Sequence, residues 1–376
     1  MQTMKGVGDK MTLPYGHRMK RLRGWLEANA IDAAIVTMPS SIAYLTGFRS
    51  DPMERFLALW IADGGETTLF VPELDALKSE GAIGVDRLVP IPDGKPPLEL
   101  LRNSCKTEPV CMGIEKDAVS WKLAEELFAS WQEAEFVDIG DEIREMRGRK
   151  TREEADFAKE AASIADAALE AALTTFIRGM KERELAEEID RQIRLKGGAG
   201  NAFATTVLGG IRSAYPHGET GLHAISEGEF LLVDMGASCH GYLSDMTRTF
   251  IVGEGSAEQE RMYETVKEAN RRAIAAVRPE EPLSSVDKAA RSWIDQQGYG
   301  SYFPHRVGHG LGVDIHEPPS IHGWNNRPIV QGMLFTIEPG IYVPGIGGVR
   351  IEDDLYVNDQ GITEQLTGFP KELRRL

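Results

Sequence analysis

Two segments of the chain, 229–251 and 333–357, show the alternation of apolar and polar residues that is typical of paired β-strands. Each of them follows two segments in which apolar residues recur with the spacing of an amphipathic helix. The order of helices followed by a strand pair therefore occurs twice. It predicts a domain of the α+β class built from two similar halves, although no literal sequence repeat links them.

Three of the predicted helices begin at residues that are typical of helix N-termini. Thr151 is followed three residues later by Glu154, which predicts a capping box at the start of a long alanine-rich helix. Ser256 and Ser284 are predicted to cap the two helices that precede the second strand pair.

The segment before residue 147 has a different pattern, in which short apolar runs alternate with helical segments. Strands are predicted at 32–37, 56–63, 67–74, 87–91, 109–115 and 135–139, and helices at 17–29, 72–81 and 120–132. Such alternation is typical of a small α/β domain. We therefore expect an α/β N-terminal domain at 1–146 and the α+β domain at 147–376.

The composition excludes several classes of protein. The formal net charge of −16 would repel a phosphate backbone, so nucleic acid is not expected as a partner. Apolar runs are too short to span a membrane, and residues 1–14 contain no apolar core of a secretory signal. Cys105, Cys111 and Cys239 make a poor disulfide framework. We expect a cytoplasmic protein without a membrane or nucleic-acid partner.

Acidic residues occupy matching positions in the first strand pair. A symmetric turn centred between Cys239 and His240 sets Asp234 directly opposite Asp245, with Cβ atoms about 5 Å apart. Like charges so placed repel each other. Burying them at the ends of apolar runs costs on the order of several kcal/mol each unless a cation compensates.

The second strand pair repeats this arrangement, because a turn centred at Gly345 sets Glu338 opposite Glu352. A single acid of this kind would more often lie on a solvated strand face, or pair with Arg248 or Arg350. Two coincident pairs of acids favour a bound metal ion over that alternative.

Three of the eight histidines lie within 305–317, in the stretch HRVGHGLGVDIHE. A helix would align His305, His309 and His316, but three glycines inside it would each cost roughly 1 kcal/mol, so we expect an extended or looped segment. Glycines also allow close approach of two backbones. One histidine could then complete a metal site that otherwise contains carboxylates, and the other two would contact substrate.

These motifs resemble those of the metallopeptidase family of prolidase, aminopeptidase P and methionine aminopeptidase, family M24, whose catalytic domain has the pita-bread fold. The resemblance covers essentially the whole chain. In that family's order the metal ligands are Asp234, Asp245, His309 in the histidine stretch, Glu338 in TIEPGIY and Glu352 in GVRIEDD. The resemblance therefore implies a pita-bread C-terminal domain with a dinuclear metal centre.

The resemblance also implies how the ligands are shared between the ions. Asp234 would chelate one ion, Asp245 and Glu352 would bridge both, and His309 and Glu338 would hold the second. Four carboxylates and one imidazole suit hard or borderline divalent ions, which favours Mn²⁺, with Co²⁺ or Zn²⁺ as alternatives. Two ions about 3.5 to 4 Å apart would lower the pKa of a bridging water and polarise the scissile carbonyl, so that hydroxide is the nucleophile.

Further residues take their roles from the same resemblance. Glu338 would accept the proton of the water, and His217 and His316 would steady the carbonyl and the tetrahedral intermediate. His305 is similar to a residue that lines the leaving-group side of the pocket. Arg350, grouped with His305 at the substrate site, would orient neighbouring acids or form a plain ion pair.

The N-terminal stretch 40–61 resembles the short bacterial Xaa-Pro dipeptidases, whose corresponding loop typically reads D-P-H-E-R, and Met53 stands in the place of that histidine. In those enzymes the loop reaches the active site of a neighbouring subunit. This implies a homodimer in which Asp51, Glu54 and Arg55 contact the substrate. The alternative is a surface turn in which Glu54 and Arg55 form a charge cluster within the chain.

Together these features predict hydrolysis of the Xaa-Pro bond of dipeptides, as in prolidase. An aminopeptidase P acting on longer peptides and a non-peptide amide or amidine hydrolase, such as an ectoine-type hydrolase, are the alternatives. A non-catalytic binding module is a more remote one, because such modules typically lose metal ligands. A dipeptidase needs a cation for the substrate carboxylate, and Arg327 is the candidate.

Overall fold

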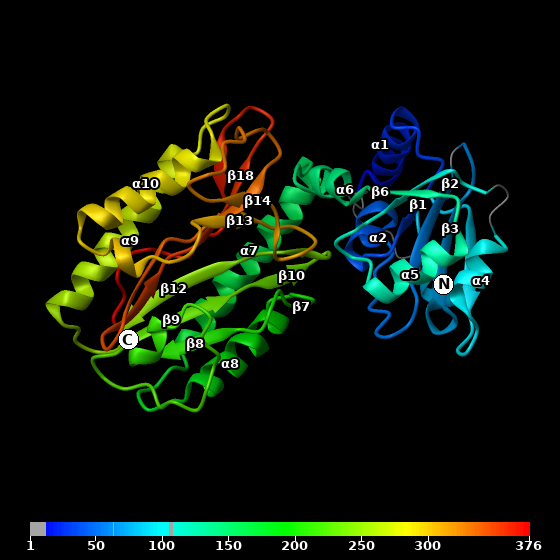
Figure 1. The fold of residues 1–376 in the computed structure, drawn as a ribbon. Helices are drawn as coiled ribbons and strands as arrows, with labels where there is room; N and C mark the ends of the chain where they lie inside the picture. The colour runs from blue at the N-terminus through cyan, green and yellow to red at the C-terminus, as the bar shows by residue number, and fades with distance from the viewer. Residues whose placement is uncertain (1–12, 63, 105–107) are drawn as a thin grey trace, which may run out of the picture. The chain divides into compact units, whose positions relative to one another are not determined.

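The computed structural model describes residues 13–62, 64–104 and 108–376. Most of the segment examined for a secretory signal, and Cys105, lie outside the described residues. Contacts within the chain divide it into two compact units, Met1–Arg147 and Gly148–Leu376 (Figure 1). Among the described residues, no helix is long and apolar enough to cross a bilayer.

The N-terminal unit contains a six-stranded mixed sheet in the order β4-β3-β2-β1-β5-β6. Its strands are β1 (Ala33–Val36), β2 (Ala58–Ala62), β3 (Thr67–Pro72), β4 (Arg87–Ile91), β5 (Cys111–Ile114) and β6 (Glu135–Asp138). Its helices are α1 (Tyr15–Ala28), α2 (Pro39–Thr46), η1 (Glu73–Asp75), α3 (Ala76–Ser79), α4 (Pro97–Arg102), α5 (Trp121–Ser130) and α6 (Gly140–Arg147). All six predicted strands are present, which confirms the α/β prediction.

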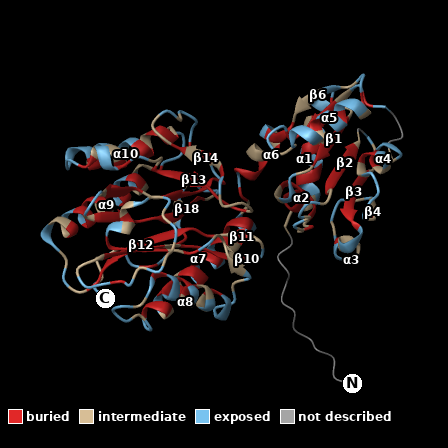
Figure 2. Ribbon diagram, turned by 60° about the horizontal axis from the view of Figure 1, so that its bottom comes forward, coloured by how far each residue is buried: buried red, intermediate tan, exposed pale blue. Residues whose placement is uncertain are grey.

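The four central strands of this sheet, β1, β2, β3 and β5, bury their side chains on both faces, and Figure 2 shows most of this region in red. Ile35, Trp60, Phe70 and Met112 come from four different strands and lie in one apolar cluster. Burial on both faces explains why these strands appear in the sequence as short continuous apolar runs.

The C-terminal unit consists of two helix pairs and several small sheets. The helices are α7 (Arg152–Leu173), α8 (Glu182–Leu195), η2 (Gly210–Ala214), α9 (Ala257–Ala276), α10 (Leu283–Gln296) and η3 (Gly300–Tyr302). The strands of the first half are β7 (Gly200–Asn201), β8 (Thr206–Gly209), β9 (Phe230–Met235), β10 (Ala237–Cys239), β11 (Tyr242–Leu243) and β12 (Met246–Ile251). Those of the second half are β13 (Gly308–Gly310), β14 (Glu317–Ile321), β15 (Leu334–Ile337), β16 (Gly340–Val343), β17 (Gly347–Arg350), β18 (Asp353–Val357) and β19 (Thr363–Gln365).

Each helix pair of this unit packs on strands of its own half. Leu169 of α7 and Ile189 of α8 lie in a buried cluster with Val233 of β9. Val266 of α9 lies in a second cluster with Phe335 of β15. The helices thus cover the outer sides of the strands, whose inner sides are left to form a site (Figure 1).

Two of the three predicted helix N-caps are confirmed, and the third, Ser284, is wrong. Thr151 and Ser256 both cap their helices within capping boxes. The helix α10, however, begins at Leu283 after Pro282, without a side-chain cap. The backbone N–H groups of Leu283 and Ser284 donate instead to the carbonyls of Arg327 and Asn325, so the free donors of the first turn are satisfied by a distant loop.

The register of the first strand pair differs from the prediction by two residues. Asp234 lies opposite Thr247 and not opposite Asp245. The reason is the turn, which is centred between His240 and Gly241 because both adopt positive φ angles, 50° and 77°. Such a two-residue turn matches the twist of the flanking strands. A shift of two residues keeps the acids on the predicted face.

The register of the second strand pair is confirmed. Gly340 pairs with Arg350, and Ile337 pairs with Asp353, as a turn centred at Gly345 requires. Glu338 and Glu352 lie between these two ladders, where the hairpin passes from one sheet to another.

Candidate metal and substrate site

A cavity of about 450 Å³ in the C-terminal unit collects most of the predicted site residues. Its lining residues are Phe203, Pro216, His217, Asp234, Asp245, His305, Arg306, His309, Ile315, His316, Glu338, Arg350 and Glu352. All five predicted metal ligands therefore face one space. The predicted residues of the N-terminal loop and Arg327 are not in this lining.

The four acids of the cavity come from strand ends and from breaks between strands. Asp234 lies near the end of β9, and Asp245 immediately precedes β12. Glu338 and Glu352 lie in the breaks of the second hairpin. The Glu352 N–H donates to the Thr247 carbonyl at 3.1 Å, which fastens the second hairpin on the first. Backbone hydrogen bonds between the hairpins thus bring acids from both halves together.

The histidine stretch is partly extended and partly looped, as predicted: it contains β13 and the loop 311–316 that leads to β14. A Cβ atom on Gly308 would lie 1.9 Å from the carbonyl oxygen of Thr336, and one on Gly310 would lie 2.1 Å from that of Pro318. Only glycine allows this close approach. It brings the backbone of His309 against the neighbouring strands.

The side chain of His309 lies among three of the acids. Its Nε2 atom is 3.6 Å from Asp245 Oδ2 and 3.6 Å from Glu338 Oε1. Ligand atoms of Asp245, His309 and Glu352 all lie within 4.8 Å of one another, and these three residues are buried. The His309 Nδ1 atom is 3.1 Å from the Gly310 carbonyl, which only accepts, so Nδ1 carries the proton and Nε2 is free to bind a cation.

Burial controls the charges of this cluster. It raises the pKa of Asp245 and of Glu352 well above their usual values, with further contributions from neighbouring acids. It also raises the pKa of Glu338 to about 7 and lowers that of His309 to about 3. In a metal-free site the imidazole is therefore neutral, and Asp245, Glu338 and Glu352 resist ionisation because they are buried next to other acids.

The residues fit a pair of divalent ions. The Oδ1 atom of Asp234 is buried and has no hydrogen-bond partner, which is costly unless a ligand occupies that position. Four carboxylates and a neutral imidazole form an oxygen-rich donor set that suits hard or borderline divalent metals.

Arg350 connects the acids to the surrounding framework. Its guanidinium pairs with Asp234 Oδ2 and donates to Thr247 Oγ1 at 3.0 Å and to Tyr342 OH at 2.9 Å. The Thr247 hydroxyl in turn donates to Glu352 Oε2 at 2.6 Å. Arg350 thus forms the ion pair that was one of its two predicted roles. Because this ion pair belongs to a network that also includes Thr247 and Glu352, it can orient the acids, which was the other.

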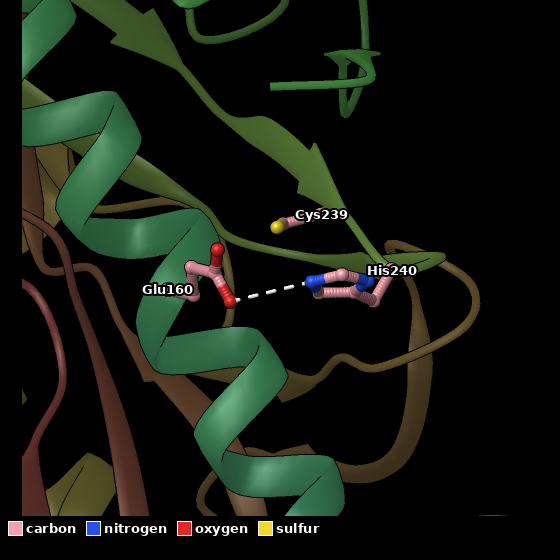
Figure 3. Close-up of side chains that lie close together, drawn as sticks. All are labelled: Glu160, Cys239 and His240. Carbon is pink, nitrogen blue, oxygen red and sulfur yellow. Dashed lines mark ion pairs between the residues drawn. The ribbon is translucent and has the colours of Figure 1, made fainter. Parts of the chain in front are cut away.

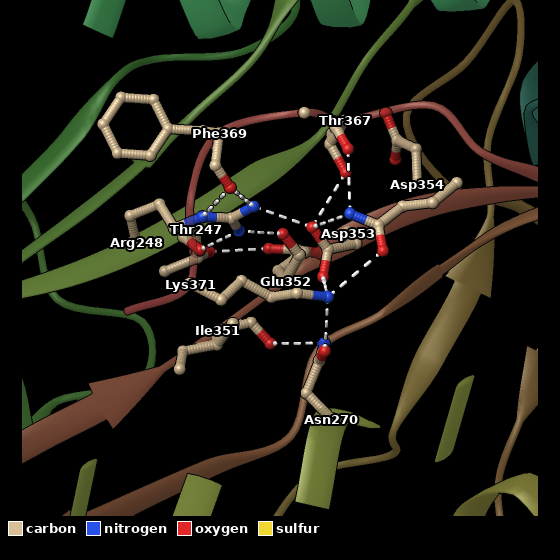
Figure 4. A network of polar contacts seen from close by, with 12 residues as sticks. Thr247, Arg248, Asn270, Ile351, Glu352, Asp353, Asp354, Thr367, Phe369 and Lys371 are labelled. Carbon is tan, nitrogen blue, oxygen red and sulfur yellow. Dashed lines mark hydrogen bonds and ion pairs between the residues drawn. The ribbon is translucent and has the colours of Figure 1, made fainter. Parts of the chain in front are cut away.

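A second polar network supports the segment that carries Glu352 (Figure 4). The buried guanidinium of Arg248 donates to the Glu352 carbonyl at 2.6 Å and to Asp353 Oδ1 at 2.7 Å. Lys371 Nζ donates to Asp353 Oδ2 at 2.8 Å. Arg248 therefore neutralises Asp353, with Lys371, and does not pair with any of the four acids of the cavity.

The other histidines of the cavity surround the cluster. His305 Nε2 lies 2.9 Å from Tyr342 OH, and burial lowers the pKa of this histidine to about 4. The ring of His316 meets that of His309 edge to face, with centroids 4.4 Å apart. His217 is exposed at the rim of the cavity. Burial also lowers the pKa of His316, so the rings of His305 and His316 offer neutral hydrogen-bonding groups to a bound molecule.

Arg306, which is not among the predicted site residues, also lines the cavity. Its guanidinium donates one hydrogen bond, to Ser320 Oγ at 3.2 Å. In the described part of the chain, no carboxylate lies within ion-pair distance of it. The only sequence signal is its place inside the histidine stretch. Arg327, the cation predicted from the sequence, is exposed on the loop before β15.

The predicted substrate loop lies in the N-terminal unit and forms its own charge cluster. Arg55 pairs with Glu54 at 2.8 Å and with Asp93 at 2.9 Å. The carboxylate of Asp51 accepts from the backbone N–H of Met53, which has a positive φ of 53°. Within the chain, the loop therefore forms the charge cluster of Glu54 and Arg55 that was predicted as the alternative to a substrate contact. Asp93 is an additional partner in this cluster.

Comparisons with known proteins agree with both halves of this description. Residues 156–359 match the model of metallopeptidase family M24, and residues 18–148 match that of the creatinase/prolidase N-terminal domain. The protein YkvY of Bacillus subtilis, which carries a provisional dipeptidase name, is 38% identical over 360 residues, covering 95% of this chain and 99% of its own.

Solved structures are similar over almost the whole chain. A prolidase from Thermococcus sibiricus has a TM-score of 0.91 and 33% identity, covering 97% of this chain and all of its own. An X-Pro aminopeptidase from Thermotoga maritima has a TM-score of 0.84 and 29% identity, covering 96% and all of its own. These similarities confirm the predicted fold, an α/β N-terminal domain followed by a pita-bread domain.

Proposed function

The chain belongs to metallopeptidase family M24, and from this premise we propose that it hydrolyses the Xaa-Pro bond of dipeptides at the cavity of the C-terminal unit. We further propose that the pita-bread catalytic domain begins at residue 147, next to the division between the two compact units. The N-terminal domain then spans 1–146.

Two divalent ions, with Mn²⁺ as the first choice, would be held by the residues that converge on the cavity. The proposed ligands are Asp234, Asp245, His309, Glu338 and Glu352. When bound, the ions supply an activated water and polarise the scissile carbonyl. The neutral imidazole of His309 and the unsatisfied Oδ1 atom of Asp234 support this assignment.

The side chains of the cavity would transfer the proton of the water and orient the substrate and the metal ligands. Glu338 is the proposed proton acceptor, because its carboxylate lines the same cavity as the other proposed ligands and lies close to His309. His316 and His217 would donate hydrogen bonds to the substrate carbonyl as charge develops on its oxygen. Arg350 and Thr247 hold Asp234 and Glu352 in place.

The observation that favours a dipeptide is the cation of Arg306. A dipeptide carries its free carboxylate one residue from the scissile bond, so that carboxylate must lie inside the cavity. In a space lined by four acids, an anionic group needs a nearby cation. Arg306 lines the cavity, and no carboxylate lies within ion-pair distance of it among the described residues. A guanidinium can hold a carboxylate with two parallel hydrogen bonds.

The remaining proposals concern assembly and location. We propose a cytoplasmic homodimer in which Asp51, Glu54 and Arg55 approach the substrate of a partner subunit. The exposure of Asp51 and Glu54 supports their availability for such a contact. A variant with Glu54→Gln and Arg55→Gln should then raise the KM for a dipeptide and leave metal binding unchanged.

The test of the proposed function is a comparison of substrate lengths. The protein is stripped with a chelator and reloaded with Mn²⁺, and cleavage of Leu-Pro, Leu-Pro-Gly and longer Xaa-Pro peptides is measured. Fast release of proline from Leu-Pro, with little cleavage of the longer peptides, is the expected result. Preference for the longer peptides would instead indicate an X-Pro aminopeptidase. Metal binding without cleavage of any of them would point to a non-peptide amide or to a binding module.

A further inference from the structure

A second group of side chains of the types that bind metal ions lies outside the cavity. Glu160 comes from α7, and Cys239 and His240 come from the tip of the β10–β11 hairpin (Figure 3). One ligand atom from each residue lies within 4.8 Å of the other two. None of the three residues lines the cavity, so this group shares no ligand with the proposed active site.

We propose that Glu160, Cys239 and His240 form a separate site for one borderline transition-metal ion such as Zn²⁺. The donors are a thiol, an imidazole and a carboxylate. This set favours softer ions than the oxygen-rich set of the cavity, because a thiolate binds Zn²⁺ and Co²⁺ well and Mn²⁺ poorly. Three protein ligands and one water would complete a tetrahedral shell.

The geometry of the hairpin tip supports this site. His240 lies in the turn with a positive φ of 50°, and its ring packs on Phe157 of α7 with centroids 4.6 Å apart. Phe157 and Glu160 are three residues apart and so lie on one face of α7. The imidazole Nε2 is 3.5 Å from Glu160 Oε2. The hairpin therefore presents the ring toward α7 while Cys239 stays buried beside it.

The ion pair between His240 and Glu160 contributes little stability of its own. The His240 and Glu160 side chains are 56% and 54% exposed, and an ion pair at such exposure contributes little to stability. A metal ion would use the thiol as well. The thiol must then lose its proton to solvent as the metal–sulfur bond forms.

The proposed ion would fasten the hairpin tip to α7. Asp234 precedes this hairpin in the chain and Asp245 follows it. The site would therefore stabilise the segment that joins two of the proposed active-site ligands. We expect Zn²⁺ to raise the thermal stability of the protein beyond the effect of Mn²⁺ in the cavity.

Cobalt gives a direct test, because only a sulfur ligand produces an intense thiolate-to-Co²⁺ charge-transfer band in the near ultraviolet. The proposed active site contains no sulfur. The protein, with Cys105 and Cys111 changed to Ser so that Cys239 is its only thiol, is titrated with Co²⁺ under a non-thiol reductant. We expect the band to level off at the intensity of one thiolate-bound Co²⁺ per chain, whatever amount of Co²⁺ the cavity also takes up, and to disappear when Zn²⁺ is added.

Three variants complete the test. Cys239→Ser should abolish the band and leave hydrolysis unchanged. His240→Asn tolerates the positive φ, and it should weaken Co²⁺ binding about tenfold or more, as should Glu160→Gln. Absence of the band, its survival in Cys239→Ser, or unchanged affinity in both other variants would overturn the proposal. Because no peptide is used in the titration, this outcome is independent of the proposed hydrolysis.

Discussion

Thr247 Oγ1 donates a 2.6 Å hydrogen bond to Glu352 Oε2 and accepts one from Arg350 Nε at 3.0 Å. The threonine belongs to the first hairpin, and the two charged residues belong to the second. The Thr247 hydroxyl therefore links the first hairpin to Glu352, and through Arg350 it also links Glu352 to Asp234.

Replacement of Thr247 by Val should keep the shape of the side chain and remove this link. We expect the affinity for Mn²⁺ or the rate of Leu-Pro hydrolysis to fall about 10- to 100-fold, as for other partners of metal ligands. Thr249→Val is the matched control, because the Thr249 hydroxyl is also buried but bonds only the backbone of Arg350. Equal losses of activity in both variants would show that the Thr247 hydroxyl has no special role in positioning Glu352.

Alanine in place of His309 or Glu352 should abolish hydrolysis, since each side chain lies in the buried cluster. The fold should remain largely intact, because removing a buried acid also removes its desolvation cost. Circular dichroism and metal analysis check this expectation. Near wild-type rates with metal still bound would exclude the assigned ligands.

Replacement of Arg306 by Ala should raise the KM for Leu-Pro about 10- to 100-fold, since hydrogen bonds to charged groups contribute about 1.5 to 3 kcal/mol. Leu-Pro amide, which lacks the carboxylate, should lose little. Arg327→Ala is the control, because Arg327 is exposed and does not line the cavity. An equal loss with both substrates would show that Arg306 does not hold the carboxylate.

The contribution of Glu338 to the stability of the metal-free protein should fall as pH rises from 4.5 to about 7, because burial raises its pKa from 4.5 to about 7. At this carboxyl the folded state binds more protons than the unfolded state in this window. His309 and His305, whose pKa values are lowered to about 3 and about 4, act in the opposite direction up to about pH 6.5. Mn²⁺ compensates the charge, so it should raise Tm more at about pH 8 than at about pH 5. Calorimetry with and without chelator checks this, and an equal effect at both pH values would contradict it.

Lys150 and Glu317 form a buried ion pair at 2.8 Å, with side chains 1% and 2% exposed. Glu317 also accepts from the backbone N–H groups of Val313 and Asp314, and so fixes the loop before His316. Lys150→Met should lower the free energy of unfolding by about 3 to 5 kcal/mol, because it leaves a buried charge uncompensated. Lys267→Met, which breaks the exposed pair with Glu264, should cost no more than about 1 kcal/mol. Urea unfolding of the two variants measures both losses in the free energy of unfolding. Equal losses would contradict the prediction.

Local patterns in the sequence predicted the elements well. Apolar periodicity located the strands, and the single glycine turn at Gly345 gave the register of the second hairpin. The register predicted for the first hairpin was wrong by two residues because its turn needs a positive φ at His240, and histidine adopts this conformation far less often than glycine. The start of α10 at Leu283 depends on carbonyls of a loop more than 40 residues away.

The site residues were predictable where strand pairing fixes their positions. They were not predictable where the direction of a long side chain decides whether it reaches the cavity. The acids and His309 stand at positions that strand pairing brings together. Arg306 is different, because the direction of its guanidinium depends on the contact with Ser320, which follows only from the pairing of β13 with β14. Arg327 was chosen for its charge alone, and its loop keeps it outside the cavity.

The most direct test of the central claim is the release of proline from Leu-Pro by protein that has been stripped of metal and then reloaded with Mn²⁺. The account predicts no release from the stripped protein, full recovery after reloading, and no recovery in Glu352→Gln under the same conditions. Bound Mn²⁺ in the wild-type protein without any release of proline would contradict the claim that this centre hydrolyses Xaa-Pro dipeptides.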